Sequence, residues 1–162
     1  MYCLKYETAL HILRMPKEVY AFWRQPQNLL PISQYLESIT STSGELDRSQ
    51  WTIRSPRGSR FDIVAELVCN QEDELLAWRG IVDTDVEVAA VVEFEAGPDG
   101  HGTILTLSLS LSLPDAKAHS DDIKRLSTHL ERHIEADLQR LKQFLEASDT
   151  SVEAEHPPGV CG

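Results

Sequence analysis

The most constraining feature of the sequence is a long amphipathic run near its C-terminus, residues 120–146. Ser120 suits the N-cap of a helix, and Asp121 and Asp122 put negative charge where the helix dipole favours it. Such a helix is ~40 Å long, so its natural partner is a curved sheet that wraps around it. Large aliphatic residues recur at steps of three and four, which places them on one helix face: Ile123, Leu126, Leu130, Ile134, Leu138, Leu141 and Leu145.

The part of the chain before this helix alternates apolar and polar residues, as half-buried β-strands do. The clearest example is residues 102–113, where five leucines alternate with serine and threonine until Pro114 ends the pattern. Turn residues separate the strands, as in the run GPDG at 97–100. Such short connections favour an antiparallel sheet with one apolar face. The predicted strands are residues 4–13, 37–43, 49–54, 60–69, 75–79, 86–95 and 102–113.

Two short helices are predicted after the first strand. Pro16 suits the first position of a helix that continues through Trp23, and Asn28 can cap a second brief turn. The sequence therefore predicts an α+β fold, with a curved antiparallel sheet of about seven strands wrapped around the long C-terminal helix. Residues 1–147 are expected to form this one domain. Residues 148–162 lack periodicity, and we expect a disordered tail there.

Composition excludes several classes of partner. The formal net charge of −11 argues against nucleic acid and against an anionic membrane surface, since both attract clustered lysine and arginine. No apolar run approaches the ~20 residues that span a bilayer, and the first residues lack a signal pattern, so we expect a soluble, cytoplasmic protein without membrane insertion. The three cysteines Cys3, Cys69 and Cys161 are widely separated. They form no paired metal-ligand motif and are predicted to be reduced thiols.

Three short segments resemble motifs of a known family: residues 15–29 (MPKEVYAFWRQPQNL), 75–79 (LLAWR) and 137–142 (DLQRLK). They are similar to the opening, a strand and the helix end of bacterial cyclase/dehydrase-like members of the START-like (SRPBCC) superfamily. That superfamily also includes coenzyme-Q-binding START domains and plant pathogenesis-related proteins. The resemblance covers about residues 4–146 and implies the helix-grip fold. It is unspecific for function, because one fold hosts many activities.

The resemblance implies a cavity between the concave face of the sheet and the long helix, which holds an apolar or aromatic small molecule. The alternative is a solid core, which an apolar stripe ordinarily forms. Ala65, Ala89 and Ala90 lie in mid-strand and favour the cavity, because small side chains leave volume unfilled. Strand parity and helix periodicity predict the ligand-binding residues: Trp51, Ile53, Phe61, Ile63, Trp78, Val88, Ala90, Val92, Leu107, Leu109, Leu130, Ile134 and Leu138.

Three polar residues are candidates for catalysis. Asp137 projects near the middle of the helix stripe, His133 at its edge one turn away, and Tyr35 near the expected mouth of the cavity. An aspartate beside a histidine can form an acid–base pair. The alternative is that Asp137 bonds backbone or an arginine, with His133 at the water line. His129 and His133 are four residues apart but lack a third ligand, so we predict neither metal nor cofactor.

Three functions remain compatible with these features. The first is binding or transport of a hydrophobic small molecule, such as a lipid, an isoprenoid or a polyketide-like compound, which requires only the cavity. The second is an aromatase/cyclase-type enzyme that folds a polyketide-like substrate, which requires inward-facing polar groups. The third is a protein-interaction module with a filled core. The apolar lining is clearer than any catalytic group, which favours the first function.

Overall fold

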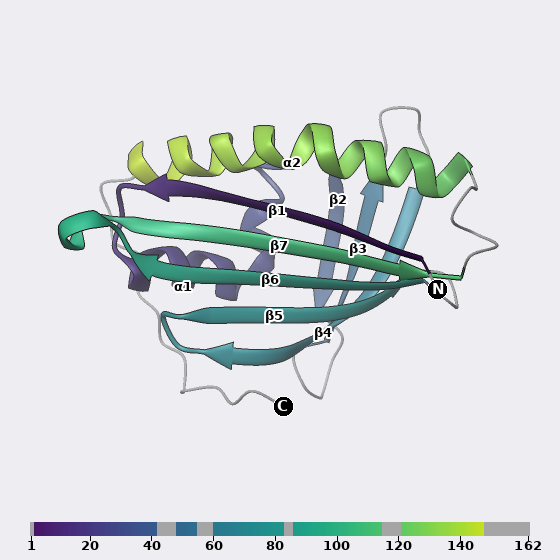
Figure 1. Cartoon of the computed structure of the whole chain (residues 1–162), viewed down its shortest axis with the longest axis horizontal. Helices are drawn as coiled ribbons and strands as arrows, with labels where there is room; N and C mark the ends of the chain where they lie inside the picture. The colour runs from purple at the N-terminus through teal and green to yellow at the C-terminus, as the bar shows by residue number, and fades with distance from the viewer. Residues whose placement is uncertain (1, 42–47, 55–59, 83–85, 115–120, 148–162) are drawn as a thin grey trace.

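The computed structural model describes residues 2–41, 48–54, 60–82, 86–114 and 121–147, and in parts of the last segment the backbone only. Figure 1 shows a strongly curved sheet with one long helix along it. The elements are β1 (Tyr2–Ile12), α1 (Pro16–Arg24), η1 (Pro26–Leu29), β2 (Leu36–Ser41), β3 (Arg48–Arg54), β4 (Arg60–Gln71), β5 (Leu75–Val82), β6 (Val86–Ala96), η2 (Pro98–Gly100), β7 (Thr103–Leu113) and α2 (Asp121–Ala147).

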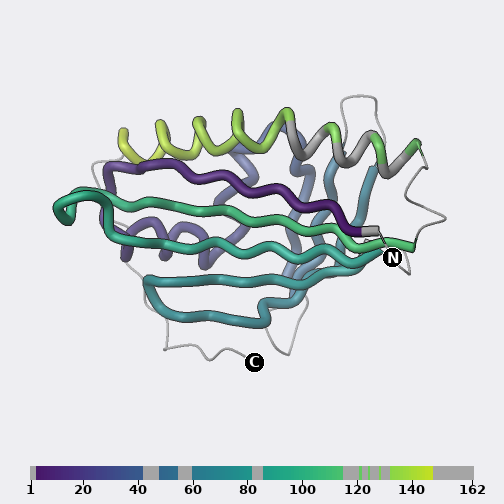
Figure 2. The backbone as a smooth tube through the Cα atoms, viewed as in Figure 1, coloured from purple at the N-terminus to yellow at the C-terminus, as the bar shows by residue number. Residues whose placement is uncertain are grey.

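The seven strands form one antiparallel sheet in the order β1-β7-β6-β5-β4-β3-β2. Every neighbouring pair except β1 and β7 is consecutive in sequence, which is the meander that the short turns predict. In Figure 2 the first strand runs between β7 and α2, and α2 contacts β1. This arrangement confirms the predicted helix-grip fold of seven strands, two short helices and a long C-terminal helix.

The short helices differ from the prediction in one respect. The second is a 3-10 helix that begins at Pro26, so Asn28 lies inside it and caps nothing. Instead, the Asn28 side-chain amide donates to the carbonyl oxygen of Phe22, 3.1 Å away, and ties η1 to the end of α1. The proline fixes a helical φ two positions before the expected cap, and it therefore determines where the turn begins. The predicted N-cap of α2, Ser120, lies outside the described residues.

The core lies between the sheet, α1 and the second half of α2. Its largest cluster joins Ile12 of β1, Tyr20 of α1, Leu76 of β5, Leu105 of β7 and Leu141 of α2, each at most 1% exposed. The leucines of α2 that the structure describes with side chains, Leu138, Leu141 and Leu145, are all buried, as the helical periodicity predicts. Among the described residues, no helix has the length and apolarity needed to cross a bilayer.

Tyr20 carries a polar group into this core. Its hydroxyl donates to the Asn70 side-chain oxygen at 2.5 Å, and both residues are buried. Burial raises the pKa of Tyr20 above its ordinary value of 10.0, against the opposing effects of Arg24 and of the hydrogen bond with Asn70. The folded state therefore keeps this proton at a pH where the unfolded chain loses it.

Replacing Tyr20 with phenylalanine is expected to lower the free energy of unfolding by about 1–2 kcal/mol at neutral pH, because the buried Asn70 oxygen loses its donor. With Tyr20 present, stability should also fall as the pH rises above about 10, since the unfolded state then binds fewer protons than the folded state. Urea unfolding at pH 7 and pH 10.5 measures both effects. Equal stability of the two proteins at pH 7 would contradict the first expectation.

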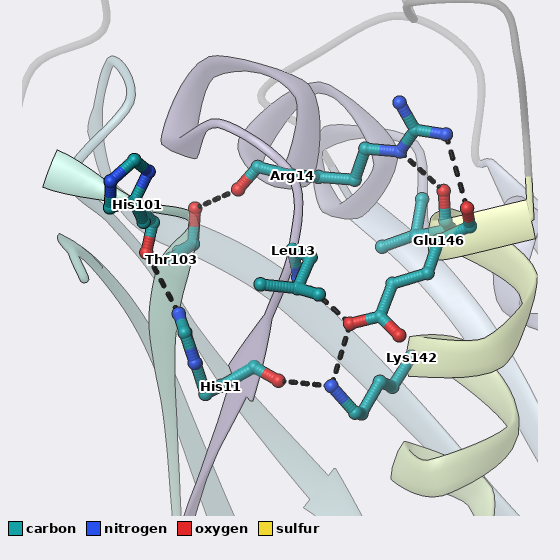
Figure 3. Close-up of polar contacts among 8 residues, drawn as sticks. His11, Leu13, Arg14, His101, Thr103, Lys142 and Glu146 are labelled. Atoms are coloured by element: carbon teal, nitrogen blue, oxygen red, sulfur yellow. Dashed lines mark hydrogen bonds and ion pairs between the residues drawn. The ribbon is translucent and has the colours of Figure 1, made fainter. Parts of the chain in front are cut away.

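A group of polar contacts holds the C-terminal end of α2 against the connection between β1 and α1 (Figure 3). Arg14 donates from Nε to the carbonyl oxygen of Leu145 at 2.6 Å and from Nη2 to that of Glu146 at 3.3 Å. The last carbonyls of a helix have no partner within it, so the guanidinium acts as a C-cap. On the other side, Thr103 Oγ1 of β7 donates to the carbonyl oxygen of Arg14 at 2.6 Å.

The carboxylate of Glu146 completes these contacts. It accepts the backbone N–H of Leu13 at 2.8 Å and the Lys142 ammonium at 2.6 Å, and Lys142 also donates to the carbonyl oxygen of His11 at 2.6 Å. These donors, Lys142 first and Leu13 second, hold the pKa of Glu146 below its ordinary value of 4.5. The C-terminal end of α2 is therefore fixed to the end of β1 by an ion pair within the helix and by hydrogen bonds to the backbone of residues 11 and 13.

The contribution of Glu146 should depend on pH. Because its folded pKa is depressed, the stabilisation is complete above pH 4.5 and is lost as the pH falls through the folded pKa. Glu146→Ala is expected to cost about 1 kcal/mol at pH 7, since two donors lose their acceptor at a partly solvated position. The difference between the two proteins should shrink in urea titrations at pH 3. A difference that does not change with pH would show that the carboxylate charge contributes nothing.

The cysteines do not all match the expectation of reduced thiols. Cys3 on β1 is free and exposed. Cys69 on β4 is disulfide-bonded, so the prediction is wrong for this residue. Sequence spacing reports only separation along the chain, whereas a disulfide depends on separation in space. Cys161 lies outside the described residues.

Candidate ligand-binding site

A cavity of about 210 Å³ lies between the sheet, α2 and the segment that joins α1 to β2. The sheet curves around one side of α2 (Figure 1), and strands β3 to β7 and the helix line the space between them. Two small residues in its wall, Ala65 and Ala90, leave volume unfilled. Eleven of the residues predicted to bind a ligand line it: Trp51, Ile53, Ile63, Trp78, Val88, Ala90, Val92, Leu107, Leu109, Ile134 and Leu138.

Two of the predicted lining residues are not in this wall. Phe61 is buried, but it packs with Val86, Leu111 and Leu113 in a second cluster. It lies on the predicted face of β4, yet strand parity gives no position along the strand, and the prediction that it lines the cavity is wrong. The side chain of Leu130 lies outside the described residues. Binding of a ligand by the other residues stays a prediction.

The connection between α1 and β2 supplies wall residues that the sequence analysis missed. Trp23 ends the buried face of α1, Leu29 ends η1, and Ile32 lies in the irregular segment before β2. Trp23 has a recognisable signal, because it continues the apolar face of the predicted helix. Leu29 and Ile32 have none, since a single short turn and an irregular segment offer no period to count. The other wall residues that were not in the predicted ligand-binding set are Ser33, Leu36, Ala65, Gly80 and Leu141.

Three tryptophans stand in the cavity wall. The ring centroid of Trp78 is 6.5 Å from that of Trp23 and 6.4 Å from that of Trp51, in tilted and edge-on arrangements. The indole N–H of Trp51 donates to Ser49 Oγ at 2.7 Å. The indole nitrogen of Trp23 is buried and has no hydrogen-bond partner among the described residues. The wall is therefore aromatic as well as aliphatic, and it contains one unpaired donor.

Asp137 is the only charged residue of the described cavity wall, and its carboxylate is already occupied. Ser33 Oγ donates to Oδ2 at 2.8 Å, and the Arg140 guanidinium forms an ion pair with Oδ1. Arg140 also donates from Nε to the carbonyl oxygen of Ile32 at 3.0 Å. Of the two roles that the sequence left open for Asp137, the structure shows the one in which it bonds an arginine. The three side chains tie the segment before β2 to α2 and do not present an available base.

Tyr35 and His133 lie beside this cluster. Their ring centroids are 4.3 Å apart at an angle of 51°, and the backbone N–H of Tyr35 donates to Ser33 Oγ at 3.3 Å. The structure thus brings together the three catalytic candidates Tyr35, His133 and Asp137. Tyr35 and Asp137 line the cavity, whereas His133 lies outside its wall. Arg79, on the opposite face of β5 from Trp78, is exposed, as its parity predicts.

Comparison with solved structures identifies the fold. The aromatase/cyclase Zhui from Streptomyces sp. R1128 superposes with a TM-score of 0.70 at 12% identity, over 90% of this chain and 94% of that one. A protein from Thermus thermophilus gives 0.69 at 21% identity, over 91% and 100%. The di-domain aromatase/cyclase StfQ of the steffimycin pathway gives 0.67 at 13% identity over 89% of this chain, which spans about half of StfQ (51%).

These similarities show a shared fold. No protein-family model and no curated protein matches the chain. The structural neighbours have the helix-grip architecture that the sequence motifs imply, and they confirm the resemblance at the level of the fold. In this chain the curved sheet and the long helix of that fold enclose a space lined mostly by apolar side chains.

Proposed function

We propose that the protein binds a hydrophobic small molecule in the cavity between the sheet and α2, and acts as its carrier. One observation supports this above others. The cavity of about 210 Å³ is lined by aliphatic and aromatic side chains, and its one carboxylate is paired with Arg140 and Ser33. Transfer of apolar surface from water into such a wall is favourable by roughly 25 cal/mol per Å². The site therefore offers apolar contacts to a ligand, and its one carboxylate already has hydrogen-bond partners.

The size of the cavity restricts the ligand. Apolar cavities of about 150 Å³ admit benzene, so about 210 Å³ accommodates a little more than one ring within the walls. A longer isoprenoid, lipid or polyketide-like molecule would place one end in the cavity and extend the remainder through its mouth. The aromatic wall of Trp23, Trp51 and Trp78 favours a ring at the enclosed end.

An aromatase/cyclase-type activity is the second candidate. It is favoured by the fold shared with Zhui and StfQ and by the grouping of Tyr35, His133 and Asp137 at one side of the cavity. It requires a group that moves protons at the substrate. Both oxygens of Asp137 already accept hydrogen bonds, which ranks this function below the carrier.

Purification from the native host, native mass spectrometry and organic extraction test the proposal directly. We expect a stoichiometric hydrophobic compound, released when the protein unfolds. Protein that arrives empty should still take up a one- or two-ring apolar fluorophore such as 1-aminonaphthalene. A protein that carries nothing and takes up none of a panel of such probes would refute the carrier proposal. It would leave the protein-interaction module as the better account.

A further inference from the structure

The disulfide bond of Cys69 has a partner that can be identified by elimination. The sequence contains three cysteines, Cys3, Cys69 and Cys161. Cys69 is disulfide-bonded, whereas Cys3 on β1 is free and exposed. Because the structure contains one chain, a partner from a second copy is not involved. The one cysteine left is Cys161, which belongs to the C-terminal segment after α2, residues 148–162.

Cys69 lies on the outer face of the sheet, away from the cavity. It pairs with Ala77 of β5, whose neighbours Leu76 and Trp78 are both buried in the core cluster. Alternate residues of a strand face opposite sides, so Ala77 and its partner Cys69 face outward. A β-bulge between Leu67 and Cys69 makes this possible, since the extra residue puts them on opposite faces although they are two positions apart. Cys69 is therefore accessible from outside the core.

The C-terminal segment is long enough to reach Cys69. It begins where the last turn of α2 contacts the end of β1 (Figure 3). Residues 148–161 span at most ~50 Å when extended. The path from β1 to β4 crosses four inter-strand steps, or ~20 Å. Along the strands, Cys69 is level with Val91 of β6, and the end of β1 is level with Ala96, ~17 Å further on. The available length exceeds this distance, even for a path around the edge of the sheet.

We propose that Cys69 and Cys161 form a disulfide that attaches the C-terminal segment to the outer face of the sheet, and that reduction of this bond releases the segment. A low-molecular-weight disulfide such as oxidised glutathione is the oxidant. One cysteine thiolate attacks it and displaces one glutathione, and the second cysteine displaces the other from the mixed disulfide. The two protein thiols are oxidised, and their two protons pass to the two glutathione thiols that are released. Exchange with a reducing dithiol reverses both steps.

Peptide mapping tests the bond directly. Trypsin cleaves after lysine and arginine, so Cys69 lies in peptide 61–79, Cys161 in peptide 143–162 and Cys3 in peptide 1–5. The full-length protein is equilibrated with oxidised glutathione, its free thiols are alkylated, and it is digested without reductant. Mass spectrometry should show peptides 61–79 and 143–162 joined, and dithiothreitol should separate them. A Cys69 that is alkylated, carries only glutathione or is joined to peptide 1–5 would overturn the proposal.

Thermal unfolding tests whether the bond holds the folded chain. The bond closes a loop of about 90 residues in the unfolded chain but one of about 15 residues beyond α2 in the folded chain, and only the difference is stabilising. Cys161→Ser should therefore lower the Tm of the oxidised protein by about 3–7 °C. Cys3→Ser is the matched control and should leave the Tm unchanged, since Cys3 is free.

Dithiothreitol should bring the Tm of the wild-type protein down to that of Cys161→Ser and leave that of Cys161→Ser as it was. This comparison does not depend on the folding of a variant, because the wild-type protein is measured in both states. An equal Tm of the wild-type protein before and after reduction would overturn the attachment of the segment to the folded sheet.

Discussion

Replacing Ala90 with leucine is expected to weaken binding of a cavity-sized apolar molecule at least tenfold. Ala90 lies on β6 opposite Trp78 of β5 and Leu109 of β7, and all three residues line the cavity. Leucine adds three carbon atoms to a wall that encloses about 210 Å³. Loss of the contacts that a displaced ring would make exceeds 1.4 kcal/mol, the equivalent of about tenfold in affinity. Isothermal titration with naphthalene measures the change.

The same substitution should leave the protein as stable or make it more so, because the new side chain gains contacts in a space that was open. Ala89→Leu is the matched control, since alternate residues of a strand face opposite sides of the sheet. Ala89 pairs with Arg79 and Ser110 on the outer face, away from the cavity. Naphthalene binding should therefore be unchanged in Ala89→Leu. Unaltered binding in Ala90→Leu would show that the apolar molecule binds elsewhere.

Replacing Asp137 with alanine is expected to lower the free energy of unfolding by about 1–3 kcal/mol. The substitution leaves Arg140 without its ion-pair partner and Ser33 Oγ without its acceptor. The side chains of Arg140 and Asp137 are 36% and 21% exposed, so solvent reduces the effect below that of a fully buried pair. Urea denaturation at pH 7 provides the measurement.

Two further variants separate the contacts of this cluster. One is Asp137→Asn, and the other is the double variant Ser33→Ala with Asp137→Ala. Asparagine keeps an acceptor oxygen but removes the charge, so the protein should retain part of the stability. The effects of Ser33→Ala and Asp137→Ala should be non-additive, since the two residues share a hydrogen bond. If Asp137→Asn left stability intact but abolished conversion of the native ligand, the carboxylate would be a catalytic group and the enzyme the better account.

The regular parts of the fold could be predicted because their periods are simple. The leucines of α2 recur every three or four residues, and those of β7 every second residue, so each pattern identifies both the element and its buried face. These periods also identified eleven residues of the cavity wall, from five strands and α2. Parity gives a face and not a position along it, which is why Phe61 was misplaced.

The polar part of the site could be predicted only as isolated residues. Asp137 was identifiable from the helix projection, but Ser33, which occupies its second oxygen, lies 104 positions away in a segment without a period. Likewise, no pattern distinguishes the unpaired indole of Trp23 from the satisfied one of Trp51. Such differences depend on which side chains meet across the closed fold, and only the three-dimensional structure reveals them.

The position of β1 affects how the protein folds during its synthesis on the ribosome. β1 is made before the other strands, but it lies at the edge of the sheet. Its one strand neighbour among the described residues is β7, whose paired residues lie about 90 to 110 positions later in the chain. At synthesis rates of roughly 5–20 residues per second, that separation leaves β1 unpaired for roughly 5–20 seconds. The helix end that contacts residues 11–14 is made later still. A nascent chain stopped before β7 would therefore present an unpaired strand edge, a surface that invites aggregation or a chaperone.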